Sequence, residues 1–149
     1  MKRILASLFV ALVLTGTSLA FAETLSELPF SKKLKLAQVG DEDAQMAVAS
    51  AYEQGGEAKK DIAEAAKWYR EAALTGNVEA EFRLARLVSK GAKGLTKDLK
   101  TAAKLYEAAA NSGHLESQNA LGQAYQNGLG VEVDEAKAVE WFQIGRAHV

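Results

Sequence analysis

The side chains that most often carry catalysis are scarce in this chain. It contains no cysteine and only two histidines, His114 and His148. Neither a Cys–His pair nor a zinc site rich in histidine can therefore be assembled. The nucleophile patterns Gly-x-Ser-x-Gly and Ser-x-x-Lys and the metalloprotease pattern His-Glu-x-x-His are also missing from the sequence. The sequence thus predicts no catalytic residue, no metal site and no cofactor.

The remaining charged residues have structural explanations. Asp43, Glu79 and Glu116 stand where the first turn of a helix favours an acid. His114 follows Gly113 at an expected helix start, where we expect a solvated end residue rather than a base or ligand. Six lysines form a loosely basic set along one edge, either a solvated rim or a patch for an anionic ligand: Lys59, Lys60, Lys90, Lys93, Lys97 and Lys100.

Composition narrows the class of protein further. The 149 residues are 25% charged and 48% hydrophobic, with one proline and a net charge of −1. These values exclude collagen-like, disulfide-stapled and strongly disordered chains. The first 22 residues contain Lys2 and Arg3 and no acid, so the remainder carries −3. We therefore expect no nucleic-acid partner.

The N-terminus has the order of a bacterial secretory signal. Lys2 and Arg3 precede the apolar run 4–14, which is followed by small residues and the triplet Ala20-Phe21-Ala22. The run is about 11 residues long, whereas a membrane span needs roughly 20. We expect a cleaved signal peptide over 1–22, cut after Ala22, and a periplasmic or secreted protein without stable membrane insertion.

From Gly40 onward the chain repeats with a period of 36 to 37 residues. Gly40, Gly76 and Gly113 form one column of the alignment of the chain with itself. Other columns align in step: Val48-Ala49, Leu84-Ala85 and Leu121-Gly122; Gly55, Gly91 and Gly128; Asp61, Asp98 and Asp134; Trp68-Tyr69, Leu105-Tyr106 and Trp141-Phe142. The extra residue of the middle unit falls in the loop 92–97, where a helical repeat tolerates insertion. The expected units are 40–75, 76–112 and 113–149.

Each unit reads as a helical hairpin, because two segments carry apolar residues at helical spacing between glycines. The first helices are expected over 41–54, 77–90 and 114–127, and the second over 61–75, 98–112 and 134–147. Asp61, Asp98 and Asp134 are the expected N-caps of the second helices, with Glu64 completing a capping box. Gly40, Gly76 and Gly113 suit the left-handed position after a helix. Small and large core residues are expected to alternate: Ala44, Ala47, Ala65, Ala72, Ala80, Ala102, Ala109 and Ala120 against Trp68, Tyr69, Tyr106, Trp141 and Phe142.

The third unit carries a long ordered pattern. With Ser117 in the place of a first alanine, the pattern continues through Ala120, Leu121, Gly122, Tyr125, Gly128, Gly130, Val131, Asp134, Ala138 and Trp141. This order resembles the Sel1-like repeat, a slightly longer relative of the tetratricopeptide repeat. The resemblance implies an all-α fold, a right-handed α-solenoid of antiparallel helix pairs whose concave surface binds proteins or peptides. The chain lacks the cysteine pairs of the disulfide-linked bacterial members, so the lactamase-like activity discussed for them is not implied.

Both ends depart from the repeat. Residues 23–39 are expected to be a linker, Thr24 to Pro29, followed by a partial capping helix over 30–39 with Ser31 as its N-cap. At the other end Arg146 takes a place held by alanine in the earlier units. The run 144–149 before a stop codon resembles the translation of a common sequencing adapter. We expect a non-native tail and a truncated last repeat; a natural short final helix is the alternative.

A binding site, if present, is expected on the first helices. Opposite their core columns these helices leave stripes at i, i+4 and i+7: Met46, Ser50 and Glu53; Phe82, Arg86 and Ser89; Asn119, Gln123 and Gln126. In the family this face lines the concave groove. Met46 and Phe82 beside Arg86 would anchor an extended peptide, or both could pack between helices as core.

Two functions fit these observations. The first is an exported, non-enzymatic adaptor that binds a protein or peptide partner in its groove. The alternative is the N-terminal recognition module of a longer cell-envelope or peptidoglycan-handling enzyme.

Overall fold

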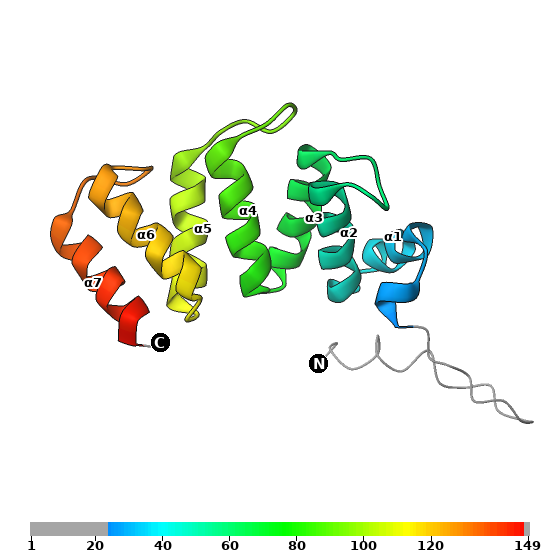
Figure 1. Cartoon of the computed structure of the whole chain (residues 1–149), viewed down its shortest axis with the longest axis horizontal. Coiled ribbons are helices and arrows are strands. Elements are labelled where there is room, and N and C mark those ends of the chain that lie inside the picture. The colour runs from blue at the N-terminus through cyan, green and yellow to red at the C-terminus, as the bar shows by residue number, and fades with distance from the viewer. Residues whose placement is uncertain (1–23, 148–149) are drawn as a thin grey trace, which may run out of the picture.

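The computed structural model describes residues 24–147, which form a row of short helices. In chain order these are the 3-10 helix η1 (Leu25–Glu27) and the α-helices α1 (Phe30–Gln38), α2 (Glu42–Gln54), α3 (Ile62–Leu74), α4 (Val78–Lys90), α5 (Leu99–Asn111), α6 (Leu115–Asn127) and α7 (Glu135–Ala147). The α-helices follow one another along a curved row, with α1 at one end and α7 at the other (Figure 1). Each α-helix packs mainly on its neighbours in sequence. The architecture is the expected all-α solenoid.

The helices of the three hairpins, α2 to α7, differ from the expected ranges by at most one residue at either end. Their second helices start at the expected caps. Oδ1 of Asp61 accepts from the backbone N–H groups of Ala63 and Glu64 at 3.0 and 3.1 Å, and Asp98 and Asp134 cap α5 and α7 in the same way. The expected capping box is wrong, because the backbone N–H of Asp61 donates to the carbonyl of Tyr52 at 2.9 Å, and the Glu64 carboxylate binds the ammonium of Lys67 instead.

The first helices have caps that the sequence analysis missed. The side chains of Asp41 and Asn77 accept from the backbone N–H groups of Ala44 and Ala80, each at 2.8 Å. Both residues follow the glycine of the first column, and that glycine has a φ of +91° at Gly40 and +88° at Gly76. A left-handed glycine therefore reverses the chain, and the next side chain starts the new helix.

Small and large residues share the core as expected. Six of the eight named alanines are at most 2% exposed: Ala44, Ala65, Ala72, Ala80, Ala102 and Ala109. Ala47 and Ala120 are half-buried. Tyr69 is fully buried, while the other named aromatics remain partly exposed. Gly122 lets α7 approach α6 closely, because a Cβ atom there would lie 2.6 Å from the ring of Phe142.

The N-terminal region is more ordered than expected. Residues 25–27 form η1 instead of a linker, and the N-cap position of α1 is Pro29, so Ser31 lies inside the helix. The ammonium of Lys33, which is 4% exposed, binds both carboxylate oxygens of Glu57 at 2.8 Å and the carbonyl of Ser26 at 3.4 Å. This buried ammonium fixes η1 and α1 to the loop after α2, which local propensity alone does not encode.

The expected signal peptide with its cleavage site at Ala22 lies outside the described residues, as does His148. No helix within residues 24–147 is both long enough and apolar enough to cross a membrane. Residues 144–147 continue α7, and Arg146 is exposed where its counterpart Ala110 is buried. A non-native origin of this tail stays a prediction.

A candidate binding face on α2, α4 and α6

The nine residues expected to line a groove all lie on α2, α4 and α6, and we call them the candidate face. Met46, Ser50, Glu53, Phe82, Arg86 and Ser89 are half-buried, whereas Asn119, Gln123 and Gln126 are exposed. The amides of the third stripe are therefore the most accessible polar groups of the face.

Phe82 stands at the centre of an aromatic cluster that spans three helices. Its ring centroid lies 4.6 Å from the ring of His114 and 6.1 Å from the ring of Tyr106. The guanidinium carbon of Arg86 lies 5.9 Å from the Phe82 centroid, within cation–π range. Phe82 is thus held in place by its neighbours while remaining partly exposed.

Glu53 accepts from side chains on two neighbouring helices, α3 and α4. Its carboxylate pairs with Arg86, lies 3.6 Å from Nη1 of Arg83, and accepts a hydrogen bond of 2.8 Å from the hydroxyl of Tyr69. Burial and this hydrogen bond raise the pKa of Tyr69 well above its usual value. The Glu53 side chain is only 13% exposed. Its role is therefore to hold α3 and α4 against α2, rather than to contact a partner directly.

Arg83 was missed by the sequence analysis. Its Nε donates to Oε1 of Glu79 at 2.5 Å, so it links Glu79 and Glu53. The spacing of Glu79 and Arg83 by four residues on one helix is a local signal that could have indicated the pair. The link to α2, by contrast, requires the tertiary structure.

His114 is not the solvated end residue that the sequence suggested. Nδ1 accepts from the backbone N–H of Ser117 at 3.2 Å, so the ring caps α6. The other ring nitrogen then carries the proton of the neutral form and donates to Oε2 of Glu79 at 3.2 Å. The side chain is 15% exposed. The expectation of a solvated side chain was wrong because the ring binds Glu79 of α4 and is largely buried there.

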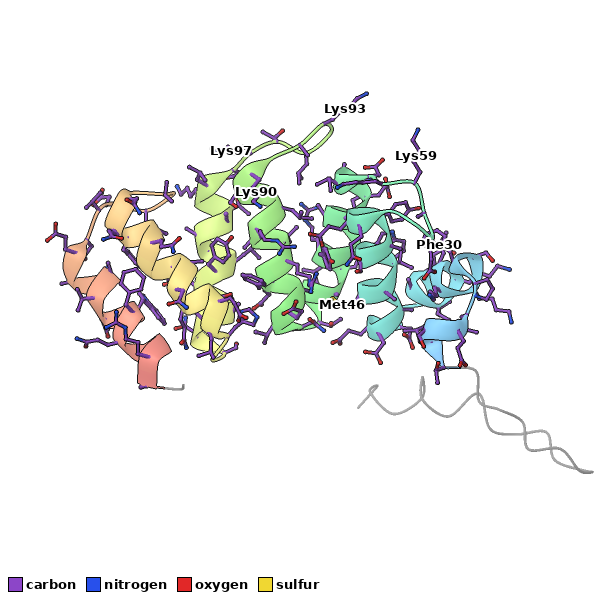
Figure 2. The ribbon with its side chains drawn as sticks, in the orientation of Figure 1. Phe30, Met46, Lys59, Lys90, Lys93 and Lys97 are labelled. Atoms are coloured by element: carbon purple, nitrogen blue, oxygen red, sulfur yellow. The ribbon has the colours of Figure 1, made fainter. Side chains whose placement is uncertain are left out.

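The rest of the candidate face is less connected. Met46 packs against the buried cluster that includes Ala49 and Leu84, and Figure 2 marks its position. Ser50 accepts a hydrogen bond from Gln54, and the Ser89 hydroxyl donates to the carbonyl of Arg86. The alternative that Met46 packs between helices agrees with this contact.

Ser89 and Gln123 meet at a small pocket between α4, α5 and α6. The pocket has a volume of about 180 Å³, and its walls include Tyr106 and Leu129. Pockets for whole small molecules are larger, at about 300–1,000 Å³. This one has room for a side chain of a partner. Asn119 and Gln126 lie outside it.

No group of three histidine, aspartate or glutamate side chains within 24–147 is placed to hold a metal ion. The candidate face offers instead an aromatic ring, a guanidinium group, amides and a pocket for one side chain.

Comparisons with known proteins bear on this arrangement. Residues 42–77, 78–114 and 115–145 match the family model of the Sel1 repeat. The chain is similar to the crystal structure of a protective antigen present in uropathogenic Escherichia coli strains that displays an SLR fold, with 33% identity and a TM-score of 0.75 over 81% of this chain. It is equally similar to a Sel1 repeat protein from Oxalobacter formigenes, with 33% identity and a TM-score of 0.75 over 80% of this chain.

These two relatives are longer, since the matches cover 26% and 49% of their chains. Cysteine rich protein B of Helicobacter pylori has 19% identity and a TM-score of 0.63, with 83% of this chain and 90% of that chain covered. That likeness concerns the fold alone. No curated protein matches the sequence.

Proposed function

Because the chain belongs to the Sel1-repeat family, we propose that it is an exported, non-enzymatic adaptor that binds an extended segment of a partner protein on the candidate face. Sel1-repeat solenoids commonly bind proteins, which supports the general role. The particular face, the export and the type of segment are our proposal.

The observation that carries it is the half-exposed Phe82 held between Arg86, Tyr106 and His114. Aromatic and arginine side chains with fixed positions are the usual energetic centres of protein interfaces. Arg86 has five N–H donors, and its ion pair with Glu53 is made through one of its nitrogens. The remaining donors can bind a carbonyl or carboxylate of the partner.

The surroundings of Phe82 and Arg86 favour an extended segment. The pocket between Ser89 and Gln123 can take one side chain, and the exposed amides of Asn119 and Gln126 can bind the backbone on either side. Since the ion pairs of Glu53 already fix Arg86, little side-chain entropy is lost on binding. The candidate face is therefore preorganised for binding.

A cross-linking experiment tests the face. A photo-reactive amino acid in place of Gln123 is compared with one in place of Glu107, which is exposed on α5 and lies outside the candidate face. We expect a discrete cross-linked protein from position 123 and not from position 107. Arg86→Ala should then reduce its yield about tenfold. The same variant leaves Glu53 paired with Arg83 and Tyr69, so the fold should persist.

Equal cross-linking from both positions, or an unchanged yield with Arg86→Ala, would remove the assignment to this face. Export is tested separately by mass spectrometry of the protein recovered from its producing cells. A periplasmic or secreted species beginning at Glu23 is expected, and a cytosolic species beginning at Met1 would contradict export. The alternative module of a longer enzyme stays a prediction.

A further inference from the structure

The loop lysines left open by the sequence analysis are not spread evenly over the molecule. Two pairs lie in loops: Lys59 and Lys60 after α2, and Lys93 and Lys97 after α4. Lys90 is the last residue of α4, and Lys100 lies in the first turn of α5. Figure 2 shows Lys59, Lys90, Lys93 and Lys97 along the same edge of the row of helices. Within the described residues, none of the six forms a salt bridge.

Three of these lysines surround one pocket. Lys59 and Lys60 lie on one side and Lys93 on the other, around a space of about 500 Å³. Its remaining walls come from the start of α3 and from the loop after α4: Asp61, Ile62, Ala63, Ala92 and Gly94. The volume is within the range of small-molecule sites. Side chains 33 residues apart in sequence thus converge on one space.

The loop that carries Lys93 is held firmly. Ala92 and Leu95 exchange two backbone hydrogen bonds of 2.9 Å, which closes a tight turn with Lys93 and Gly94 at its tip. Leu95 packs on the buried cluster of the hairpins. Gly94 has a φ of +80°, and a Cβ atom there would lie 3.2 Å from the Cβ of Ala63. The tip of the turn therefore lies against the start of α3.

The opposite loop is fixed as well. The backbone N–H of Asp61 donates to the carbonyl of Tyr52 at 2.9 Å, and Glu57 is bound by the buried Lys33. Both walls of the pocket are consequently positioned by contacts that do not involve the three lysines. The lysines remain available for a ligand.

The charge of the pocket is positive. Asp61 is the only acid in its walls, and its carboxylate is engaged by the N–H groups of Ala63 and Glu64. The walls thus contain three lysines and one aspartate. The corresponding loop of the third unit, 128–134, has Glu132 and Asp134 and no lysine. The positive charge is therefore specific to this pocket and is not shared by the corresponding loop of the third unit.

From this arrangement we propose that the pocket between the loops after α2 and α4 binds an anion with phosphate groups. Lysine ammonium groups bind phosphate as point charges, whereas arginine suits the bidentate recognition of a planar carboxylate. The pocket contains lysines and no arginine. Ile62, Ala63 and Ala92 give it an apolar wall for the organic part of such a ligand. The phosphate group can belong to a soluble compound or to the headgroup of a phospholipid.

The test uses the purified protein and pyrophosphate as the probe. Backbone amide signals of Ala63, Ala92 and Gly94 are followed by NMR at low salt. We expect a saturable shift of these signals, with binding about tenfold weaker in the double variant Lys60→Gln, Lys93→Gln. The matched control is Lys35→Gln, Lys104→Gln, which removes the same charge at exposed positions on α1 and α5. It should bind as the wild type does.

Vesicles of phosphatidylcholine with and without phosphatidylglycerol distinguish the source of the phosphate. Flotation with the anionic vesicles that depends on Lys60 and Lys93 supports a headgroup, and pyrophosphate binding without flotation supports a soluble ligand. Equal weakening by both double variants overturns the proposal, as does the absence of binding in both assays. Binding of an oligoglutamate peptide in place of pyrophosphate also overturns it. Cross-linking from position 123 should be unaffected by the loop variants, so this site and the candidate face can fail independently.

Discussion

Glu81 occupies a place in the middle repeat where the other two units have glutamine. Nε2 of Gln45 donates to the carbonyl of Ala37 at 3.3 Å, and Nε2 of Gln118 donates to the carbonyl of Ala110 at 3.2 Å. Both glutamines are buried. These hydrogen bonds join each first helix to the helix before it.

The equivalent acceptor in the middle unit is the carbonyl of Ala73. It accepts from the backbone N–H of Gly76, just as the carbonyls of Ala37 and Ala110 accept from Gly40 and Gly113. An ionised Glu81 has no proton to donate to it. Burial also raises the pKa of Glu81 above its ordinary value, because the charged form loses hydration.

We therefore predict that Glu81→Gln stabilises the protein at neutral pH. A buried hydrogen bond contributes about 1 kcal/mol net, and for a domain of this size that corresponds to an increase in Tm of about 4 °C. The free energy of unfolding is measured by urea denaturation. The control is Glu107→Gln, which removes the same charge at an exposed position on α5 and should change stability by less than about 0.5 kcal/mol.

The gain in the free energy of unfolding from Glu81→Gln should depend on pH. A group whose folded-state pKa is raised contributes stability that is fully present below its unfolded pKa and is lost as the pH rises through its folded pKa. A glutamate carboxyl in water has an ordinary pKa of 4.5. Below that value the protonated side chain can itself donate to Ala73. The difference between Glu81→Gln and wild type should thus be small near about pH 4 and reach its full size by about pH 7.

The reasoning is refuted if Glu81→Gln is no more stable than wild type at neutral pH while Glu107→Gln behaves as expected. An advantage of equal size at both pH values would also refute it, because the loss of charge at Glu81 would then not be the cause. A crystal structure or amide NMR of the variant shows directly whether the new donor reaches Ala73.

Three further predictions concern packing. Gly122→Ala should destabilise the protein by about 1–3 kcal/mol in urea denaturation, because the new Cβ would lie 2.6 Å from the Phe142 ring; a neutral effect would show that α7 moves away freely. Glu57→Gln should cost about 1 kcal/mol and speed amide exchange in α1, since the buried Lys33 loses its counter-charge; exchange rates in α1 equal to wild type would contradict the role of this pair. Amide exchange should also be fastest in α7, which packs mainly on α6 and leaves Val139 53% exposed; uniform protection through residue 142 would contradict this.

The sequence by itself determined the helices and their order. Each relevant signal acts over a few residues: the cap at Asp61 reaches N–H groups two and three positions ahead, and glycine at position 76 can adopt the left-handed conformation that ends a helix. The repetition of these signals at intervals of 36 and 37 residues made the hairpins recognisable. The same local logic failed at Ser31 and Glu64, where several positions or partners were equally close in sequence.

The tertiary structure alone decided which side chains meet. Glu53 pairs with Arg86 across 33 residues, and His114 reaches Glu79 across 35. Lys93 joins Lys59 at one pocket because Gly94 lies against Ala63. The rotation and spacing of successive helices set these contacts. That helix geometry depends in turn on how the side chains of the core pack against one another. A repeated pattern fixes which face of each helix is buried, but the partners of the polar residues on the other faces follow only from that packing.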